Sequence, residues 1–206
     1  MEGENMGRRS LHTAEELREL IIGASTDLIR ESGLEGLSAR EIARRIDYSP
    51  GTIYNSFENL DDLVLTIEGR LLDSLLDALA ALPQERDDRV RVQKIASRYL
   101  EFVADNPKLW NLLVEHNLPA SRTAPEWYRQ KLEALMKIVE RALLPLAKDG
   151  IGDEDLARSA RVLWAGVHGI ASLSTDNKLS MVASDHAGVM LEDFVRTYLA
   201  GFERGQ

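Results

Sequence analysis

The feature of this sequence that most constrains its fold is the helical spacing of its apolar residues. They recur at intervals of three and four positions along most of the 206 residues, which places them on one face of an α-helix. No segment shows the strict alternation of apolar and polar residues that is typical of a half-buried strand. The pattern therefore predicts an all-α protein.

Capping signals set the ends of the first predicted helix. Thr13 precedes Glu16 by three residues, the spacing of a capping box in which each side chain accepts a hydrogen bond from the other residue's backbone N–H. We expect the helix to begin near Thr13 and to end before Gly33, because glycine commonly follows a helix C-terminus. Its apolar face is predicted to consist of Leu17, Leu20, Ile21, Ala24, Leu28 and Ile29.

Two shorter helices are predicted to follow. Ser38 and Glu41 have the spacing of a second capping box. The residues expected to face the first helix are Ile42, Ala43 and Ile46. Ser49 and Pro50 then combine an N-cap with proline at the first helical position, where its missing N–H costs nothing. A third helix is therefore expected from Pro50 to about Phe57.

The remainder of the chain is predicted to be helical as well. Asn59 caps a fourth helix that is expected to reach Leu82, before Pro83 stops it. Five further segments keep the helical spacing, at residues 87–105, 107–117, 125–148, 153–174 and 184–202. Pro145 should kink or end the third of these. We predict two domains, a three-helix domain at residues 10–58 and a larger helical domain at residues 59–206.

Composition narrows the class of protein. Hydrophobic residues make up 44% and charged residues 29%, as in ordinary soluble globular proteins. The absence of cysteine excludes disulfides and cysteine-based zinc sites and favours a cytoplasmic location. The polar N-terminus and the lack of a long apolar stretch argue against a signal peptide and against a membrane span. A net charge of -9 argues against non-specific coating of nucleic acid.

The segment from Ser38 to Phe57 has the layout of a helix-turn-helix. Its second helix opens with Pro50, Gly51 and Thr52, which are small enough to let the helix approach base edges in a major groove. Free backbone N–H groups at the start of that helix favour phosphate oxygens. This segment therefore predicts binding to double-stranded DNA.

Individual roles within this segment follow from side-chain chemistry. Hydroxyl groups are expected to bind phosphates and fix the register on the duplex. Arginines of the preceding helix are expected to reach the DNA backbone, and Arg40, at the helix start, a base. The candidate DNA-binding residues are Ser38, Arg40, Arg44, Arg45, Ser49, Pro50, Gly51, Thr52, Tyr54 and Asn55. Arg8 and Arg9 are either a minor-groove arm or a solvated tail.

Residues 17–64 resemble the DNA-binding domain of the tetracycline-repressor (TetR) family. The resemblance rests on Gly33 and Gly36 after the first helix, on Ser38 to Ala43, on Gly51 to Tyr54, and on Phe57. It implies a DNA-binding head, a helical body that dimerises and binds a ligand, and repression relieved by a small molecule of unknown identity. The operator would be roughly palindromic, with half-sites about 34 to 36 Å apart.

The chain departs from the family pattern at the end of this segment. Leu60 stands where a lysine often begins the fourth helix, and Asn55 and Ser56 replace a common histidine-containing pair. The first sixty residues hold seven arginines and eleven acidic residues, a net charge of -4. We therefore expect tight binding only at a specific operator, by a dimer.

The body contains a second, shorter resemblance. Trp164, His168 and Gly169 are similar to a Trp-x-x-x-His-Gly signature of one C-terminal subgroup of the family. Gly166 and Gly169 would each weaken an exposed helix by up to about 1 kcal/mol, so a neighbouring helix or a ligand is expected to approach them closely. The resemblance implies a homodimer through the last two long helices, about residues 153–174 and 184–202.

The candidate effector pocket gathers aromatic and polar residues of the body. Its predicted members are Phe102, Trp110, Leu113, His116, Trp127, Trp164 and His168. Tryptophans at helical spacing are more often core residues, and a buried histidine such as His168 is more often hydrogen-bonded within the protein than to a ligand. Both interpretations stay open.

Other classes of function fit the sequence less well. Motifs for phosphate-cradling loops, nucleophile elbows and helical di-iron sites are absent, so we predict neither an enzyme nor a cofactor. Two isolated histidines, His116 and His168, are a weak signal for a metal, and we assign none. The alternatives are a trihelical packing unit with no DNA role, and a helical small-molecule binding protein whose head no longer binds DNA.

Overall fold

The computed structural model describes residues 12–118, 122–175, 179–181 and 186–204, and these residues form helices and loops without a strand. The all-α prediction is thereby confirmed. The α-helices are α1 (Ala14–Ser32), α2 (Ala39–Ile46), α3 (Pro50–Ser56), α4 (Leu60–Ala80), α5 (Asp88–Asp105), α6 (Pro107–Glu115), α7 (Glu126–Leu143), α8 (Asp153–Thr175) and α9 (Ala187–Arg204). Short 3-10 helices lie at Leu34–Gly36, Leu144–Leu146 and Leu179–Met181.

The chain forms two compact units that divide within α4, between Ile67 and Glu68. We call residues up to 67 the head and the remainder the body. The head therefore includes the first two turns of α4, whereas the sequence analysis placed the boundary at residue 58. α4 carries apolar residues on both sides of this division, so hydrophobic spacing alone gives no sign of it.

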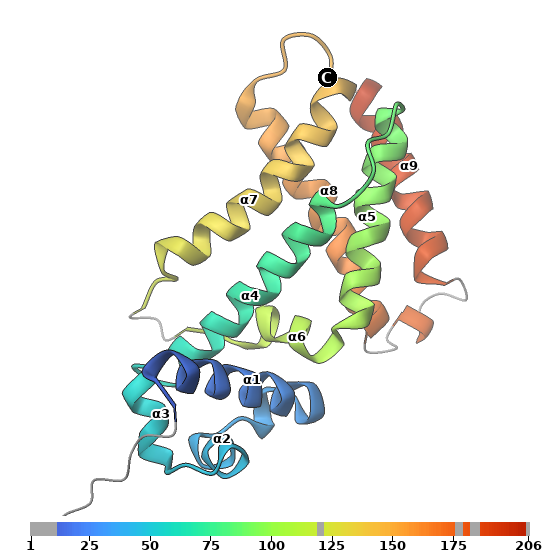
Figure 1. Ribbon diagram of the computed structural model, residues 1–206. Coiled ribbons are helices and arrows are strands. Elements are labelled where there is room, and N and C mark those ends of the chain that lie inside the picture. Colours follow the sequence, from blue (N-terminus) through green and yellow to red (C-terminus); the bar gives the residue numbers. More distant parts are fainter. Residues whose placement is uncertain (1–11, 119–121, 176–178, 182–185, 205–206) are drawn as a thin grey trace, which may run out of the picture. The chain divides into compact units, whose positions relative to one another are not determined.

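The head is a three-helix cluster formed by α1, α2 and α3 (Figure 1). Thr13 begins α1 through the predicted capping box, with the Glu16 N–H donating to Thr13 Oγ1 at 3.2 Å and the Thr13 N–H donating to Glu16 Oε2 at 2.7 Å. The core consists of fully buried side chains from all three helices and the start of α4: Ile21, Ile29, Ile42, Ile53, Phe57 and Leu63. Leu20, expected on the apolar face, is instead 37% exposed.

The turn between α2 and α3 depends on a left-handed residue. Asp47 has φ 58° and ψ 45°, and the Tyr48 N–H donates to the Ala43 carbonyl at 2.9 Å. The Tyr48 hydroxyl lies 2.8 Å from His12 Nδ1. Aspartate tolerates this backbone conformation better than most residues, so the sequence permits the sharp turn that the helix pair requires.

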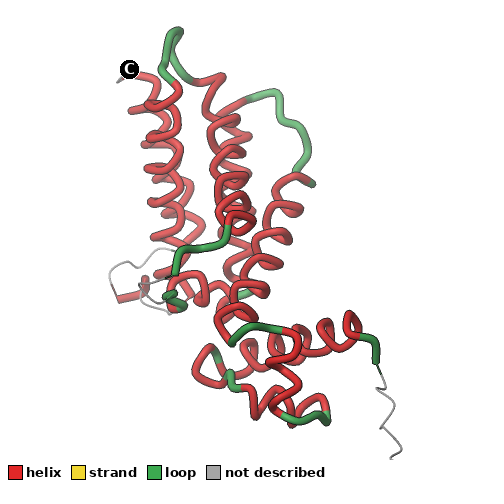
Figure 2. Tube along the Cα trace, turned by 90° about the vertical axis from the view of Figure 1, so that its left-hand side faces the viewer, coloured by secondary structure: helices red, strands yellow, loops and turns green. Residues whose placement is uncertain are grey.

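The body is a bundle in which α5, α8 and α9 run side by side and α7 packs on α5 and α8 (Figures 1 and 2). Its core contains Val103, Leu112, Leu143, Ala160, Ala171 and Leu191, each 1% exposed or less. Pro145 ends the predicted 125–148 helix early, because α7 stops at Leu143 and a 3-10 turn follows. Residue 184, where the last helix was expected to begin, lies outside the described residues.

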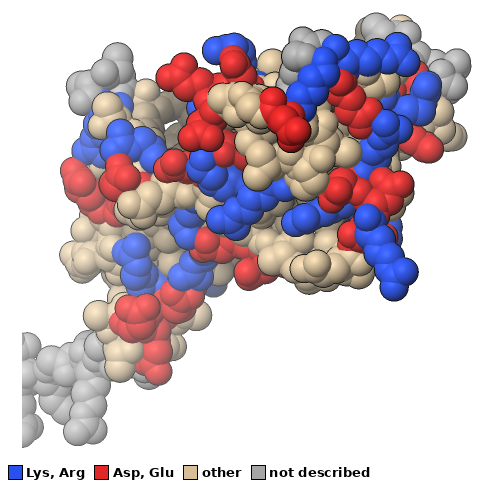
Figure 3. Space-filling model, turned by 90° about the horizontal axis from the view of Figure 1, so that it is seen from above, with Lys and Arg blue, Asp and Glu red and all other residues tan. Residues whose placement is uncertain are grey.

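Acidic and basic side chains intermingle on the face shown in Figure 3. In the body, oppositely charged residues pair within one helix, as Arg158 does with Asp155, or between helices, as Arg89 of α5 does with Glu203 of α9. Such exposed pairs stabilise a protein little. Among the described helices none is both long and apolar enough to cross a membrane.

Candidate nucleic-acid interface

The recognition helix α3 presents a small polar face to solvent. Pro50 occupies its first turn, as predicted, but the Ser49 side chain caps no backbone N–H and instead lies 3.1 Å from Thr52 Oγ1. Ile53 is fully buried, so the exposed residues lie opposite the side that packs on the head. Ser49, Pro50, Gly51, Tyr54 and Asn55 are exposed, and Thr52 is partly exposed.

Two residues of this face, Gly51 and Tyr54, affect how closely another molecule can approach α3. Gly51 has open space around it, since an added Cβ would meet only Ser49 Oγ at 3.9 Å. The packing of the head therefore does not require glycine at residue 51. The close approach of a nucleic acid to α3 would require a small residue at this position. Tyr54 is 53% exposed, so its ring and hydroxyl are accessible to an external molecule.

Arg18 of α1 holds the end of α3 in place. Its Nη1 donates to the Ser56 carbonyl at 2.6 Å, and its guanidinium carbon lies 4.0 Å from the centre of the Phe57 ring. One arginine thus satisfies a carbonyl at the helix C-terminus and makes a cation–π contact. The sequence analysis did not assign this positioning residue, because nothing in the sequence links residues 38 positions apart.

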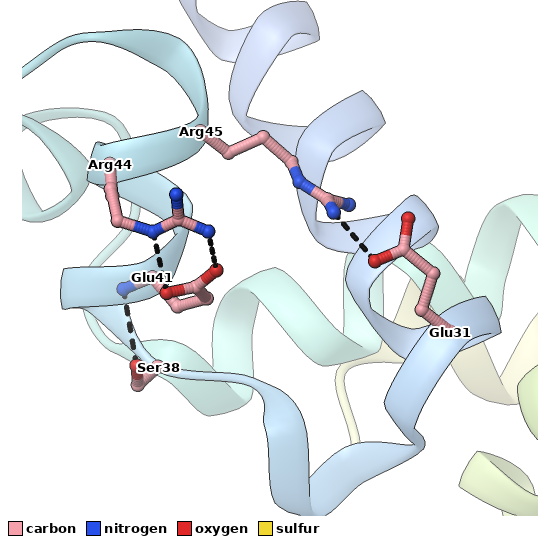
Figure 4. Close-up of polar contacts among 5 residues, drawn as sticks. All are labelled: Glu31, Ser38, Glu41, Arg44 and Arg45. Carbon is pink, nitrogen blue, oxygen red and sulfur yellow. Dashed lines mark hydrogen bonds and ion pairs between the residues drawn. The ribbon is translucent and has the colours of Figure 1, made fainter.

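Arg44 and Arg45, predicted to reach the DNA backbone, are each paired with a carboxylate (Figure 4). Arg44 Nε donates to Glu41 Oε2 at 3.0 Å, and these hydrogen bonds lower the pKa of the Glu41 carboxyl. Arg45 Nη2 lies 2.6 Å from Glu31 Oε2 and so joins α2 to α1. To bind a phosphate, either guanidinium must share or leave its carboxylate.

The pairing of Arg44 also changes the predicted cap of α2. The Glu41 N–H donates to Ser38 Oγ at 3.2 Å, as expected (Figure 4). The return bond from the Ser38 backbone to the Glu41 side chain is not formed, because Glu41 turns to Arg44 instead. Only half of the second predicted capping box is present.

Arg40 differs from the other arginines of the head. It lies in the first turn of α2 and is exposed. Arg18, Arg30, Arg44 and Arg45 each bind a carbonyl or a carboxylate, whereas no such partner of Arg40 lies within the described part of the head. Its guanidinium group is therefore the one most available to an external acceptor.

In the body, several predicted pocket residues form an aromatic cluster around Tyr99. The Trp110 ring meets Tyr99 edge-on at 5.3 Å and Phe102 at 6.0 Å. Trp164 stacks on the His168 ring, with 5.0 Å between centroids and an interplanar angle of 17°. The side chains of these residues come from α5, α6 and α8, so the structure brings together positions that are distant in sequence.

His168 is hydrogen-bonded at both ring nitrogens. Its Nδ1 lies 2.7 Å from the Tyr99 hydroxyl and its Nε2 lies 3.2 Å from Ser172 Oγ. Burial lowers the pKa of His168, so the ring is neutral at neutral pH. Burial also raises the pKa of the Tyr99 hydroxyl far above its usual value. His168 is thus satisfied within the protein.

Two indole nitrogens of the cluster are buried. Nε1 of Trp110 has no hydrogen-bond partner among the described residues, whereas the Trp164 indole interacts with the Tyr99 hydroxyl and opposes the rise in its pKa, although the bond is not of standard geometry. Leaving a buried donor unpaired costs about 1 to 3 kcal/mol.

A cavity of about 30 Å³ adjoins this cluster within the body. Its walls come from α4, α5, α7 and α8: Leu79, Val92, Ile95, Ala96, Tyr99, Leu135, Val139, Ala142, Leu163, Trp164 and Val167. Of the predicted pocket residues only Trp164 lines it. The aliphatic wall residues carried no polar signal in the sequence, so they could not be told from ordinary core.

The other predicted pocket residues lie elsewhere in the body. His116 Nδ1 lies 3.0 Å from Glu68 Oε1, and the two side chains are 7% and 3% exposed. Tyr128 is beside this pair, and burial together with the Glu68 carboxylate raises its pKa. Trp127 is 40% exposed and packs against Gly69, and Leu113 of α6 is partly exposed. No group of three potential metal ligands occurs among the residues described.

Comparison with known families identifies both units. Residues 21–67 match the family described as bacterial regulatory proteins, tetR family, and residues 92–198 match the tetracyclin repressor-like C-terminal domain. The second match alone covers more than half of the chain. The chain belongs to the TetR family. It is a DNA-binding transcriptional regulator, as the sequence analysis predicted, while its place in the Trp-x-x-x-His-Gly subgroup stays a prediction.

Individual relatives of this TetR regulator agree with that assignment. An uncharacterised HTH-type transcriptional regulator of Mycobacterium tuberculosis is 25% identical over 190 residues, which cover 91% of this chain and 82% of the relative. A protein of unknown function from Rhodococcus sp. RHA1 has the same fold, with a TM-score of 0.76 at 22% identity over 96% of this chain and all of the other. A tetR-family regulator from Streptomyces coelicolor gives 0.69 at 19% identity, over 92% and 81%.

Proposed function

We propose that this TetR regulator is a homodimeric repressor that leaves a roughly palindromic operator when a small molecule binds its body. The proposal is carried by the exposed polar face of α3 together with Arg40 at the start of α2, an exposed arginine of the head with no partner among the described residues. A face of this kind suits a major groove, where an unpaired guanidinium can bind guanine and hydroxyls can bind phosphate.

The DNA contact that we assign to each residue depends on which arginines are already paired within the head. Arg40 is assigned to a base edge and Thr52 and Tyr54 to phosphates, while Ser38, Ser49, Pro50, Gly51 and Asn55 line the same approach. Arg44 and Arg45 contribute phosphate contacts only as they exchange Glu41 and Glu31 for the DNA backbone. Arg8 and Arg9 lie outside the described residues.

The dimer is assigned to α8 and α9, which pack on one another in the body. Val162 and Leu173 on α8 and Val189 on α9 are 53%, 41% and 57% exposed, and a second copy would cover such apolar side chains. Gly169 and Gly201 also face open space in one protomer. A two-fold interface would bury this surface and pair two heads with the two halves of a palindrome.

The cavity beside Trp164 is the proposed effector site. A ligand lifts repression only to the extent that it binds the conformation without DNA affinity more tightly than the DNA-binding conformation. Ligand binding in the body must therefore change the conformation of the head. α4 supplies residues to both units and contributes Leu79 to the cavity wall, which makes it the proposed lever. A regulator of this type works on DNA in the cytoplasm.

Selection of random duplex DNA by the purified full-length protein tests the proposal. Enriched sequences are then titrated with protein across a salt series, together with size measurements of the free protein. We expect a palindromic site, a dimer, and affinity that falls steeply with salt because phosphate contacts release counterions. Enrichment of no site at low salt, with the dimer intact, would contradict the repressor assignment.

The acidic head gives some support to a second candidate, a helical small-molecule binding protein without DNA affinity. The pairing of Arg44 and Arg45 with carboxylates weakens the positive surface of the head. The same selection separates the two, because the second candidate predicts ligand binding by the body without any enriched duplex.

A further inference from the structure

We propose that the hollow between the end of α4, the start of α5 and the end of α7 binds a small organic phosphate, that is, a phosphate monoester of an apolar group. The site is distinct from the cavity beside Trp164, with which it shares only Leu79 and Ile95, and it goes beyond the proposed function. Three features support it: the cations that line the hollow, the lack of partners for two of them, and the apolar residues that accompany them.

The hollow has a volume of about 250 Å³ and is formed by three segments of the body. Its lining residues are Leu79, Ala80, Leu82, Pro83, Gln84 and Glu85 from the end of α4 and the following loop, Arg91, Lys94 and Ile95 from α5, and Ile138 and Arg141 from α7. On each of α5 and α7 an arginine and an isoleucine are three or four residues apart, a spacing that places them on one face of the helix. Because α5 packs on α7, the two faces meet at this hollow.

The lining of the hollow carries more positive than negative charge. Its cations are Arg91, Lys94 and Arg141, and its single acidic residue is Glu85. This local excess of positive charge occurs in a chain whose net charge is -9. Cations gathered in a concave surface attract an anion, and the Gln84 side chain adds an amide that can donate a hydrogen bond.

The two arginines of the hollow have no partner in the part of the chain that the structure describes. Neither the Arg91 nor the Arg141 side chain makes a hydrogen bond or an ion pair there. Other arginines of the body are paired with a carboxylate, as Arg158 is with Asp155. One exposed arginine without a partner is ordinary, but two that reach the same hollow from different helices leave two guanidinium groups available to one anion.

An ion pair at the edge of the hollow provides its third cation. Lys94 of α5 is paired with Glu85 of the loop between α4 and α5, which holds this loop against α5. An anion in the hollow can share the Lys94 ammonium group with Glu85, whereas the Glu85 carboxylate repels it. Loss of the Glu85 charge should therefore strengthen the binding of an anion.

The number of cations favours a phosphate over a carboxylate. A phosphate monoester carries a charge of about -1.5 to -2 at pH 7 and has three strong acceptor oxygens. A carboxylate carries one charge on two oxygens. Arg91, Lys94 and Arg141 can each donate to a different phosphate oxygen, and the guanidinium group suits phosphate because its N–H groups donate in parallel.

The remaining lining residues favour an apolar group on the phosphate. Apart from the charged residues and Gln84, every lining residue is apolar. Ile95 and Ile138 are partly exposed, so a ligand that covers them gains hydrophobic free energy that inorganic phosphate cannot gain. The volume lies near the lower end of the range for pockets that hold small organic ligands. We therefore assign the site to a soluble molecule rather than to a lipid in a membrane.

Isothermal titration calorimetry of the full-length protein tests the proposal with four probes. Hexyl phosphate has both the head and the tail, hexanoate has the other anionic head, 1-hexanol has a similar tail without charge, and inorganic phosphate has the head alone. We expect hexyl phosphate to bind about tenfold more tightly than hexanoate or inorganic phosphate, and 1-hexanol to bind least. Sodium chloride should weaken the binding of hexyl phosphate, because exposed charges are screened.

Substitutions locate the binding in the hollow. Arg91→Gln and Arg141→Gln should each weaken hexyl phosphate binding by about tenfold, the loss expected for one charge-assisted hydrogen bond. Glu85→Gln should tighten it severalfold, a gain that general destabilisation of the body cannot produce. Arg161→Gln is the matched control, since Arg161 is an exposed arginine of α8 outside the hollow, and it should leave the affinity unchanged.

No binding of hexyl phosphate at millimolar concentration, or equal affinity in Arg91→Gln, Arg141→Gln and the unaltered protein, would overturn the site. Hexanoate that binds as tightly as hexyl phosphate would overturn the assignment to a phosphate, and inorganic phosphate that does so would overturn the apolar part. Tighter binding to phosphatidylcholine vesicles that contain dioleoyl phosphatidate would overturn the assignment to a soluble molecule. These measurements require no DNA, so they are independent of whether an operator is found.

Discussion

The Phe194 ring of α9 lies over Gly166 of α8 so closely that a Cβ atom at residue 166 would come within 2.1 Å of Phe194 Cζ. Gly169, three residues further along the same helix, has nothing within 4 Å of the corresponding position. The sequence analysis expected crowding at both glycines. Of these two glycines only Gly166 is crowded within one protomer, because the Phe194 ring covers residue 166 and does not reach residue 169.

Gly166→Ala is therefore expected to destabilise the protein by about 1 to 3 kcal/mol, since the ring or the helix must move. Urea unfolding at fixed protein concentration measures the change. In the Phe194→Leu background the same substitution should cost much less. Equal costs in both backgrounds would show that the ring is not the obstacle.

Gly169→Ala is the matched comparison. In an isolated protomer it should stabilise α8 by up to about 1 kcal/mol, the ordinary difference in helix propensity. If α8 forms the dimer interface as proposed, Gly169→Leu should instead weaken dimerisation, which sedimentation at several concentrations would detect. A Gly169→Leu dimer as tight as that of the unaltered protein would exclude this residue from the interface.

The buried pair of Glu68 and His116 predicts a large effect on stability. Removal of His116 leaves the buried Glu68 side chain with Tyr128 as its remaining polar neighbour, so His116→Ala should lower the free energy of unfolding by about 1 to 3 kcal/mol. The double substitution Glu68→Gln with His116→Ala should cost less than the two single changes added together. Arg129→Ala, which breaks an exposed pair with Glu126, should cost less than about 1 kcal/mol.

His168 predicts a loss of stability in mild acid. Burial holds its pKa below the ordinary value of 6.5, so between the two pKa values the unfolded chain binds a proton that the folded chain does not. The contribution is complete above pH 6.5 and declines as the pH falls from there towards the pKa of the folded state. The urea midpoint should therefore fall between about pH 7.5 and about pH 5.5, and fall less in His168→Asn. An identical fall in both proteins would exclude His168 as the source.

The recognition face predicts a separation of DNA affinity from stability. Arg40→Ala should weaken operator binding by about 1 to 3 kcal/mol and relax the preference at one base pair. Thr52→Ala and Tyr54→Phe should weaken binding to all sequences alike, since both side chains are assigned to phosphates. Dimerisation and unfolding should not change. Arg98→Ala, which removes a partly exposed arginine of the body, is the control.

The carboxylates that pair with arginines predict a gain of affinity. Glu41→Gln removes a negative charge and frees Arg44, so non-specific and operator binding should both tighten severalfold, with a steeper dependence on salt. In the Arg44→Ala background the gain should be smaller. An unchanged salt slope would show that Arg44 does not reach the DNA.

Much of the fold was accessible from local sequence signals. Thr13 and Glu16 marked the start of α1, and Pro50 marked the start of α3, because capping depends on residues within one turn of each other. Pro145 marked the end of α7 for the same reason. The small and hydroxyl-bearing residues of α3 were also visible in the sequence because they are contiguous, and their contact with DNA stays a prediction.

Contacts between distant residues were beyond the reach of such signals. Arg18 beneath the end of α3, the Glu68–His116 pair and the Tyr99–His168 hydrogen bond each join positions at least 38 residues apart. The sequence predicted Trp164 and His168 as pocket residues. It could not show which aliphatic residues line a cavity and which lie in the core, because both positions take the same residue types. The pairing of Glu41 with Arg44 was local, yet the capping box competed for the same carboxylate.

By itself, then, the sequence determined the all-α fold, the position of the helix-turn-helix and the family. Each of these depends on the spacing of residues within a few turns of one helix. Tertiary structure alone decided which arginine of the head has no described partner, which of the two α8 glycines is crowded and where the cavity lies. The physical reason is that packing, burial and hydrogen-bond satisfaction depend on which neighbours the fold brings within a few ångströms.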